Sequence, residues 1–191
     1  MLTLIAVNIL IFFACEYLGG SEDLELMHRL GVLYVPDLQN GEYWRLFTAM
    51  FLHYGFAHLM SNMVSLFAFG GYMEHAIGHV RFLLLYMLGG LAGSLACWFW
   101  DVQTGEYVFS AGASGAVFAL MGGMLTLVIL RRELTRGVSV PRMLLAVVLS
   151  LYPAFYMEDI SLAAHVGGLI GGLVIMGALL PTIRSGGGKR W

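Results

Sequence analysis

Long apolar runs, separated by shorter polar segments, occupy most of the 191-residue chain. A helix that crosses the hydrocarbon core of a bilayer needs about 20 predominantly apolar residues. Six runs approach or reach that length, at residues 2–18, 57–76, 80–100, 114–131, 141–157 and 162–180. They predict an all-α, polytopic membrane protein with one domain over residues 1–191, built as a six-helix bundle with a long loop at 19–56 and a tail at 181–191.

The first run also has the length of a secretory signal peptide. However, no Lys or Arg precedes it, and Ala14-Cys15-Glu16 makes a poor cleavage site. We therefore expect residues 2–18 to remain as a span. Cys15 and Cys97 both lie in apolar runs without a Cys-x-x-Cys pair, which favours packing roles for both.

Composition agrees with a membrane protein. Hydrophobic residues make up 59% of the chain and charged residues 12%, with a mean hydropathy of +0.81. The six runs use most of the sequence, so no second soluble domain is expected. The net charge of −2 and the lack of a basic patch with interleaved aromatic residues argue against a nucleic-acid partner.

Loop charges predict the orientation in the membrane. One side of the bundle holds eight of the ten basic residues: Arg81, Arg131, Arg132, Arg136, Arg142, Arg184, Lys189 and Arg190. The other side holds most of the acids: Glu22, Asp23, Glu25, Asp37, Glu42, Asp101, Glu106, Glu158 and Asp159. Because basic loops stay in the cytoplasm, we expect a cell (inner) membrane protein with both termini and the basic tail at 181–191 cytoplasmic.

With this orientation, the runs at 57–76, 114–131 and 162–180 all begin on the outer side. His58, Asn62, Ser114 and His165 then lie within a turn or two of that side, at about 1.5 Å per residue. Polar side chains are costly in a membrane and usually serve a function there. We expect these four residues, from three helices, to meet at one depth.

Their chemistry suggests a hydrolase. Ser114 would be a nucleophile, with His165 as general base and later general acid. His58 and Asn62 are spaced i, i+4 on one helix face, and with the Ser114 backbone N–H they would stabilise an oxyanion. The alternatives are that His58 and Asn62 bond each other or nearby backbone, and that Ser114 serves helix packing. For His165 the alternative is a ring held by a backbone carbonyl.

A third catalytic member is not evident. Glu158 and Asp159 precede His165 by seven and six residues in an outer loop, and neither has helical spacing to it. This favours a Ser–His dyad over a triad. Phe118, four residues after Ser114, is a candidate to stack on the imidazole ring.

The sequence gives little support for a metal site or for a transport function. His75 and His79 fall at the cytoplasmic end of their helix, far in depth from His165, and the chain has no His-Glu-x-x-His motif. We expect no metal and no cofactor. A small transporter or channel is disfavoured because paired intramembrane carboxylates and an inverted repeat are not evident.

Several short motifs match in type, order and spacing those of one family. They are Glu42-Tyr43-Trp44-Arg45, His58-x-x-x-Asn62 followed by Glu74 and Gly78, Gly112-Ala113-Ser114-Gly115, and Ala164-His165-x-x-Gly168-x-x-x-Gly172. Together they make residues 42–172 resemble the rhomboid family of intramembrane serine proteases, in the minimal six-helix prokaryotic form. Phe118 stands where some members have tyrosine.

The resemblance implies an endopeptidase that cleaves the transmembrane segments of single-span or multi-span membrane proteins near the outer leaflet. It implies Ser114 as nucleophile, His165 as base, and an oxyanion hole of His58, Asn62 and the Ser114 amide. Structural roles are implied for Glu42, Trp44, Arg45, Glu74, Gly112, Gly115, Phe118, Gly168 and Gly172. The alternative is a catalytically inactive rhomboid-like scaffold that binds membrane proteins.

Substrate entry has a candidate route. Pro153 is expected to break the run at 141–157 near its outer end, with the loop at 156–161 as a cap. We expect the mobile end of this helix to admit a substrate helix from the lipid. The substrate must then unwind locally, which favours helix-breaking or small residues near the cut.

Overall fold

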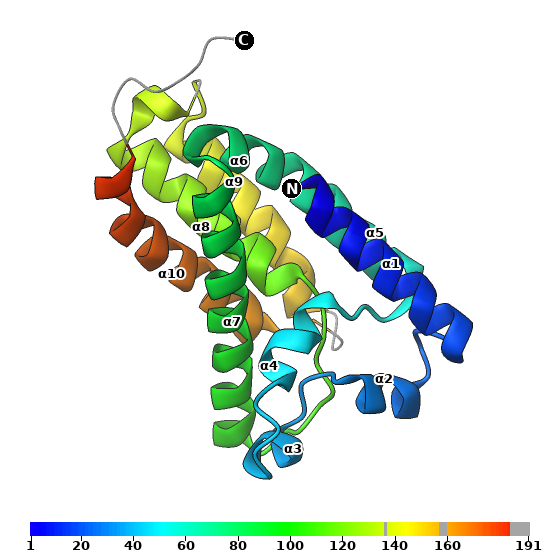
Figure 1. The fold of residues 1–191 in the computed structure, drawn as a ribbon. Helices are drawn as coiled ribbons and strands as arrows, with labels where there is room; N and C mark the ends of the chain where they lie inside the picture. Colours follow the sequence, from blue (N-terminus) through cyan, green and yellow to red (C-terminus); the bar gives the residue numbers. More distant parts are fainter. Residues whose placement is uncertain (136, 157–159, 184–191) are drawn as a thin grey trace.

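A computed structural model gives the fold of residues 1–135, 137–156 and 160–183 (Figure 1). The described residues form helices and no strand, with one isolated β-bridge between Leu33 and Ser110. The α-helices are α1 Leu2–Leu18, α2 Leu24–Leu30, α3 Val35–Gln39, α4 Arg45–Thr48, α5 Gly55–Ser65, α6 Gly71–Ile77, α7 His79–Thr104, α8 Ser114–Leu130, α9 Val140–Leu151 and α10 Leu162–Leu179. The expectation of a mostly helical fold is thus confirmed.

Among the described residues, two helices are long and apolar enough to cross a bilayer by length and composition, namely His79–Thr104 and Leu162–Thr182. Three further helices, Leu2–Leu18, Ser114–Leu130 and Val140–Phe155, are apolar but shorter. The predicted run at 57–76 is divided into α5, a π-helical segment Leu66–Gly70 and α6. The backbone hydrogen bonds of this run therefore change to the i→i+5 pattern of a π-helix midway, which the apolar pattern does not reveal.

Helix α8 lies at the centre of the bundle. Of its 17 residues, 13 are buried, on all sides of the helix. It packs against α7, α9 and α10, and the π-helical segment 66–70 also contacts it (Figure 1). A helix that is apolar all round is expected in such a central position.

Glycines bring α8 and α10 into backbone contact. A Cβ added at Gly168 would lie 2.1 Å from the Gly115 carbonyl oxygen, and one at Gly172 would lie 2.0 Å from that of Ala119. In the other direction, a Cβ at Gly122 would lie 2.1 Å from the Leu169 carbonyl oxygen. Small residues permit this approach, which packing in lipid favours because no hydrophobic drive acts between the helices.

Helix α7 joins the same contact from a third side. A Cβ at Gly93 would lie 2.8 Å from the Ala164 carbonyl oxygen and 3.1 Å from Gly115 Cα. One at Gly167 would lie 2.2 Å from Ala96 Cβ. The three helices thus meet through small residues at the level where α8 and α10 begin.

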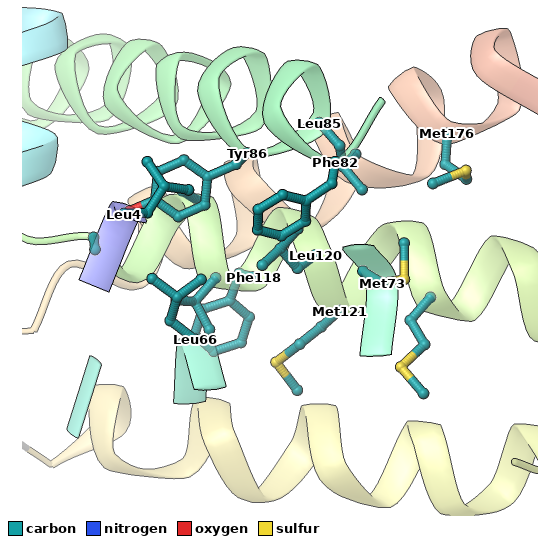
Figure 2. Close-up of a cluster of buried hydrophobic side chains, with 14 of the residues drawn as sticks. Leu4, Leu66, Met73, Phe82, Leu85, Tyr86, Phe118, Leu120, Met121 and Met176 are labelled. Atoms are coloured by element: carbon teal, nitrogen blue, oxygen red, sulfur yellow. The ribbon is translucent and has the colours of Figure 1, made fainter. Parts of the chain in front are cut away.

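Large apolar side chains fill the remaining space. Figure 2 shows Phe82 and Tyr86 pointing from α7 towards α8, in one cluster with Leu66, Leu120 and other buried residues. Tyr86 is fully buried, as is the polar residue Asn8 of α1, whose Nδ2 donates to the Leu4 carbonyl within its own helix.

The predicted loop at 19–56 contains the short helices α2, α3 and α4 and is organised around Arg45. The Arg45 side chain is buried, and its Nε lies 2.8 Å from Glu42 Oε2 and 3.2 Å from Asp37 Oδ2. Its Nη1 donates to the carbonyls of His28 and Val32. The guanidinium also lies 4.7 Å from the Trp44 ring centroid. Arg45 therefore ties four parts of the loop together, which Lys with its single ammonium group would not do.

Near the C-terminal end of α9, Pro153 lies in a 3₁₀ turn, Tyr152–Phe155, and α9 ends at Leu151. The sequence-based expectations for Arg136, for the loop residues 157–159 and for the tail residues 184–191 lie outside the described residues.

The glycine contact predicts a selective effect of Gly168→Ala. The added methyl would meet the Gly115 carbonyl, so the helices must separate, and overpacking of this kind costs about 1–3 kcal/mol. The free energy of unfolding, measured in mixed detergent micelles, should fall by that amount. Gly177→Ala is the matched control in α10, because a Cβ there meets no atom within 4 Å. Equal stability of the two variants would contradict the proposed close contact.

Candidate active site

A small cavity lies at the end of the bundle where α5, α8 and α10 begin. Its volume is about 70 Å³, enough for roughly two water molecules at about 30 Å³ each. Ser114, His165 and His58, from three different helices, line it. Other lining residues are Tyr54, Ser94, Cys97, Phe109, Ser110, Gly112 and Ser161. We call this space the Ser114 cavity.

Ser114 is the first residue of α8 and follows a tight turn. Gly112 has φ +128°, a conformation that favours glycine, and its N–H donates to the Ala49 carbonyl at 2.8 Å. A Cβ on Gly112 would lie 2.8 Å from His58 Nε2 and 3.8 Å from Ser114 Oγ. Glycine is therefore needed at position 112 for two reasons. It adopts the positive φ angle, and it leaves room between His58 Nε2 and Ser114 Oγ.

His165 lies one turn into α10 and is 7% exposed. Its ring stacks on Phe118 of α8, with centroids 4.3 Å apart and planes at 22°. Its Nδ1 is buried and has no hydrogen-bond partner among the described residues. Among the described residues, the stack and the backbone contact at Gly168 hold the ring.

Asn62 does not line the Ser114 cavity. It is 5% exposed, and its Nδ2 donates to the His58 carbonyl oxygen at 3.0 Å, one turn earlier in α5. This is the local hydrogen bond that the sequence left open as the alternative for this pair. The amide nitrogen carries a second N–H, which this bond leaves unused.

Sequence reasoning missed a polar cluster around Cys97. The Ser161 hydroxyl lies 3.3 Å from Cys97 Sγ, and Ser110 Oγ lies 3.5 Å from it. Asp101, which is 6% exposed, follows one turn later on α7. The i, i+4 spacing of Cys97 and Asp101 is a local signal for this cluster, whereas the contacts to Ser110 and Ser161 come from distant segments. In the described parts of the chain, no three His, Cys, Asp or Glu residues are grouped so that they could hold a metal ion.

Glu74 lies at the opposite end of the bundle from the cavity. Its Oε1 lies 2.8 Å from His79 Nδ1 and 2.8 Å from the Met1 nitrogen. Glu42, Trp44 and Arg45 lie in the loop described above. These four residues contribute no group to the lining of the Ser114 cavity.

The chain resembles known proteins over most of its length. A family model described as a rhomboid domain matches residues 40–182. The chain is 35% identical to the rhomboid protease GluP of Bacillus subtilis over 179 residues, which is 92% of this chain and 34% of that protein. It is 38% identical to RHOMBOID-like protein 5 of Arabidopsis thaliana over 165 residues, 85% of this chain and 52% of that protein.

A third relative is similar in size. The putative rhomboid protease YdcA of Bacillus subtilis is 36% identical over 142 residues, which cover 74% of this chain and 70% of that protein. By contrast, the chain spans only about a third of GluP and about half of the Arabidopsis protein. The similarity therefore concerns the helical domain that contains the Ser114 cavity.

His53 predicts a pH effect on stability. Burial, with a smaller contribution from the His58 ring, lowers the pKa of His53 to about 3, against an ordinary value of 6.5. The unfolded chain therefore binds a proton below pH 6.5 that the folded protein does not. The stabilising contribution is complete above pH 6.5 and is lost as the pH falls towards 3, by at most about 1.4 kcal/mol per pH unit.

Unfolding measured at pH 7 and pH 5 tests this effect. The His53→Gln variant cannot take up the proton, so its free energy of unfolding should fall less over this range than that of the wild type. If the two proteins lose stability in parallel, His53 is not a buried neutral group.

Proposed function

The chain belongs to the rhomboid family, whose members are integral membrane proteins, and we propose that it is an intramembrane serine endopeptidase acting through a Ser114–His165 dyad. The observation that carries the proposal is the lining of one cavity by Ser114, His165 and His58 from three separate helices. The relatives named as rhomboid proteases support the reaction class.

The proposed reaction has two steps. Ser114 Oγ attacks the carbonyl carbon of the substrate peptide bond while His165 Nε2 takes the hydroxyl proton, and the same nitrogen then gives that proton to the leaving amine. The acyl group is left as an ester on Ser114. A water molecule, deprotonated by His165, attacks this ester and releases the new carboxylate terminus with the Ser114 hydroxyl restored.

The charge that develops on the carbonyl oxygen needs hydrogen-bond donors. The Ser114 N–H belongs to the first turn of α8, where backbone amides lack an intrahelical acceptor and the helix dipole favours an anion. His58, with its Nε2 beside Gly112, donates when that nitrogen carries the proton. The second N–H of Asn62 would be the third donor. One such donor is worth about 10²–10³ in rate.

A dyad rather than a triad is supported by His165 Nδ1. This nitrogen has no partner in the described parts of the chain, and Phe118 holds the ring by stacking instead. Glu158 and Asp159 lie outside the described residues. The stack supplies orientation, which in a triad comes from a carboxylate.

We propose that the chain crosses a cell membrane six times with both termini in the cytoplasm, and that the Ser114 cavity faces the outer side. The 17 residues of α8 span about 26 Å at about 1.5 Å per residue, less than the roughly 30 Å hydrocarbon core. A centred helix of this length leaves both its ends close to the boundaries of the core, so we propose that Ser114 lies near the outer one. Cleavage near the outer leaflet follows from this depth.

The size of the cavity limits how a substrate can enter. Its volume of about 70 Å³ is smaller than a peptide segment, and we propose that part of the bundle moves aside when a substrate enters. Helix α9 is a candidate, because its main helical contact is with α8 and it ends at Leu151, just before the 3₁₀ turn that contains Pro153. A transmembrane segment of a single-span or multi-span protein would enter between α9 and α5 and unwind locally.

The alternative function is a catalytically inactive scaffold that binds membrane proteins. The close packing around Ser114 and His165 is compatible with it, since glycines and a buried ring also serve stability. Activity assays on the nucleophile separate the two functions.

Ser114→Ala should abolish cleavage of a labelled single-span substrate in proteoliposomes, with a loss of at least about 10³-fold because no nucleophile remains. His165→Ala should have a similar effect, because the hydroxyl then lacks its base. Ser139→Ala is the control for the loss of a serine hydroxyl. Ser139 does not line the Ser114 cavity, and its side chain makes no capping hydrogen bond at the start of α9. Equal cleavage by the wild type and Ser114→Ala would end the serine-protease proposal.

Joining α5 to α9 should suppress cleavage of spanning substrates. Cysteines at Val64 and Val148, which are 60% and 61% exposed, offer positions for bifunctional thiol reagents of increasing length. Short links should lower turnover and long ones should restore it, because only a short link prevents separation. Unchanged turnover with the shortest link that forms would contradict entry between these helices.

A further inference from the structure

His53 is a buried polar residue that the proposed reaction does not use. It lies between the 3₁₀ turn Ala49–Phe51 and α5, and it is 1% exposed. Its Nδ1 is buried and makes no full hydrogen bond among the described residues, although the Phe51 backbone interacts with the ring. A buried donor without a full hydrogen bond costs about 1–3 kcal/mol of stability. The presence of His53 at this position therefore needs a physical explanation.

The other ring nitrogen contacts the turn that leads to the nucleophile. The Ala113 N–H donates to His53 Nε2 at 3.4 Å, across 60 residues of sequence. Since Nε2 accepts here, the neutral ring must carry its proton on Nδ1. The low pKa of His53 keeps the ring neutral at physiological pH, so the acceptor is always available.

The segment containing His53 holds two successive amides of this turn. Gly112 N–H donates to the Ala49 carbonyl, and Ala113 N–H to His53. Both amides are thereby directed to residues 49–53. The next amide along the chain is that of Ser114, which begins α8 and is free of an intrahelical acceptor.

The His53 ring also supports His58. The two ring centroids lie 5.2 Å apart with planes at 68°, an edge-to-face arrangement. His58 Nε2 in turn lies beside Gly112. One side chain thus contacts both the turn before Ser114 and the ring that faces the Ser114 cavity.

We propose that His53 is a positioning residue, which holds the Ala113 amide and the His58 ring so that the Ser114 N–H and His58 point to one oxyanion position. The inference rests on the proposed protease function. Accepting at Nε2 places the ring proton on Nδ1, which defines the tautomer that the role requires.

Three variants test the role. His53→Leu removes the acceptor, His53→Gln keeps an oxygen at about the reach of Nε2, and His53→Asn keeps an amide that is too short. Misplacement by about 1 Å can cost about 100-fold in rate. We expect His53→Leu and His53→Asn to lower kcat about 10- to 100-fold with KM within about threefold, and His53→Gln to recover most of the loss.

The control is His79→Gln, since the His79 side chain is 89% exposed at the far end of the bundle. It should leave kcat unchanged. Wild-type kcat in His53→Leu would overturn the proposal. Equal losses in Leu, Asn and Gln variants, in proportion to lost thermal stability, would also overturn it, because the role would then be packing alone. If His53→Leu does not fold, the comparison of kcat between His53→Asn and His53→Gln decides between a positioning role and packing alone.

A readout without catalysis separates this proposal from the protease function. In the Ser114→Ala protein, ¹⁵N spectra of the His53 ring should show the proton on Nδ1 and a hydrogen-bonded, unprotonated Nε2. A proton on Nε2 would overturn the positioning role even where cleavage is Ser114-dependent. The expected spectrum together with cleavage by Ser114→Ala would instead leave the His53 contact in place and remove the protease function.

Discussion

The backbone contact between α8 and α10 is the constraint on which the rest of the structure depends. Lipid offers no hydrophobic drive for two apolar helices to associate, so close packing has to supply it. Gly168 and Gly172 place the backbone of α10 directly on that of Gly115 and Ala119. Because Ser114 and His165 each lie within three residues of this contact, the same packing that holds the bundle together also places their side chains at one cavity.

The remaining side of the cavity comes from the polar loop rather than from the helices. Arg45 ties the loop together, the Leu33–Ser110 bridge joins it to the segment before α8, and residues 49–53 hold the turn at Gly112. The Ser114 cavity therefore lies between a close-packed helical core and a hydrogen-bonded loop. This arrangement suits the proposed hydrolysis, which needs water at Ser114 but not in the surrounding apolar core.

Apolar length was a good guide to the helices because membrane helices form wherever a long apolar run must satisfy its own backbone. The observed α1 has the bounds of the first predicted run, and α8 ends within one residue of its predicted range. The three short helices in 19–56 and the π-helical segment Leu66–Gly70 were not predicted. The short helices have polar, mixed sequences and are held by Arg45, and the π-helical segment lies against α8, so both depend on tertiary contacts.

The sequence by itself determined which residues are candidates for chemistry, since the type and order of His58, Ser114 and His165 follow from local pattern, and their expected depth from loop charge. Only the tertiary structure decided how they are held. It places Phe118 on the His165 ring, turns the Asn62 amide to the His58 carbonyl, and brings His53 to the Ala113 amide. The physical reason is that a hydrogen bond or a ring stack depends on which side chains folding brings together, and residues 53 and 113 are joined by no local pattern.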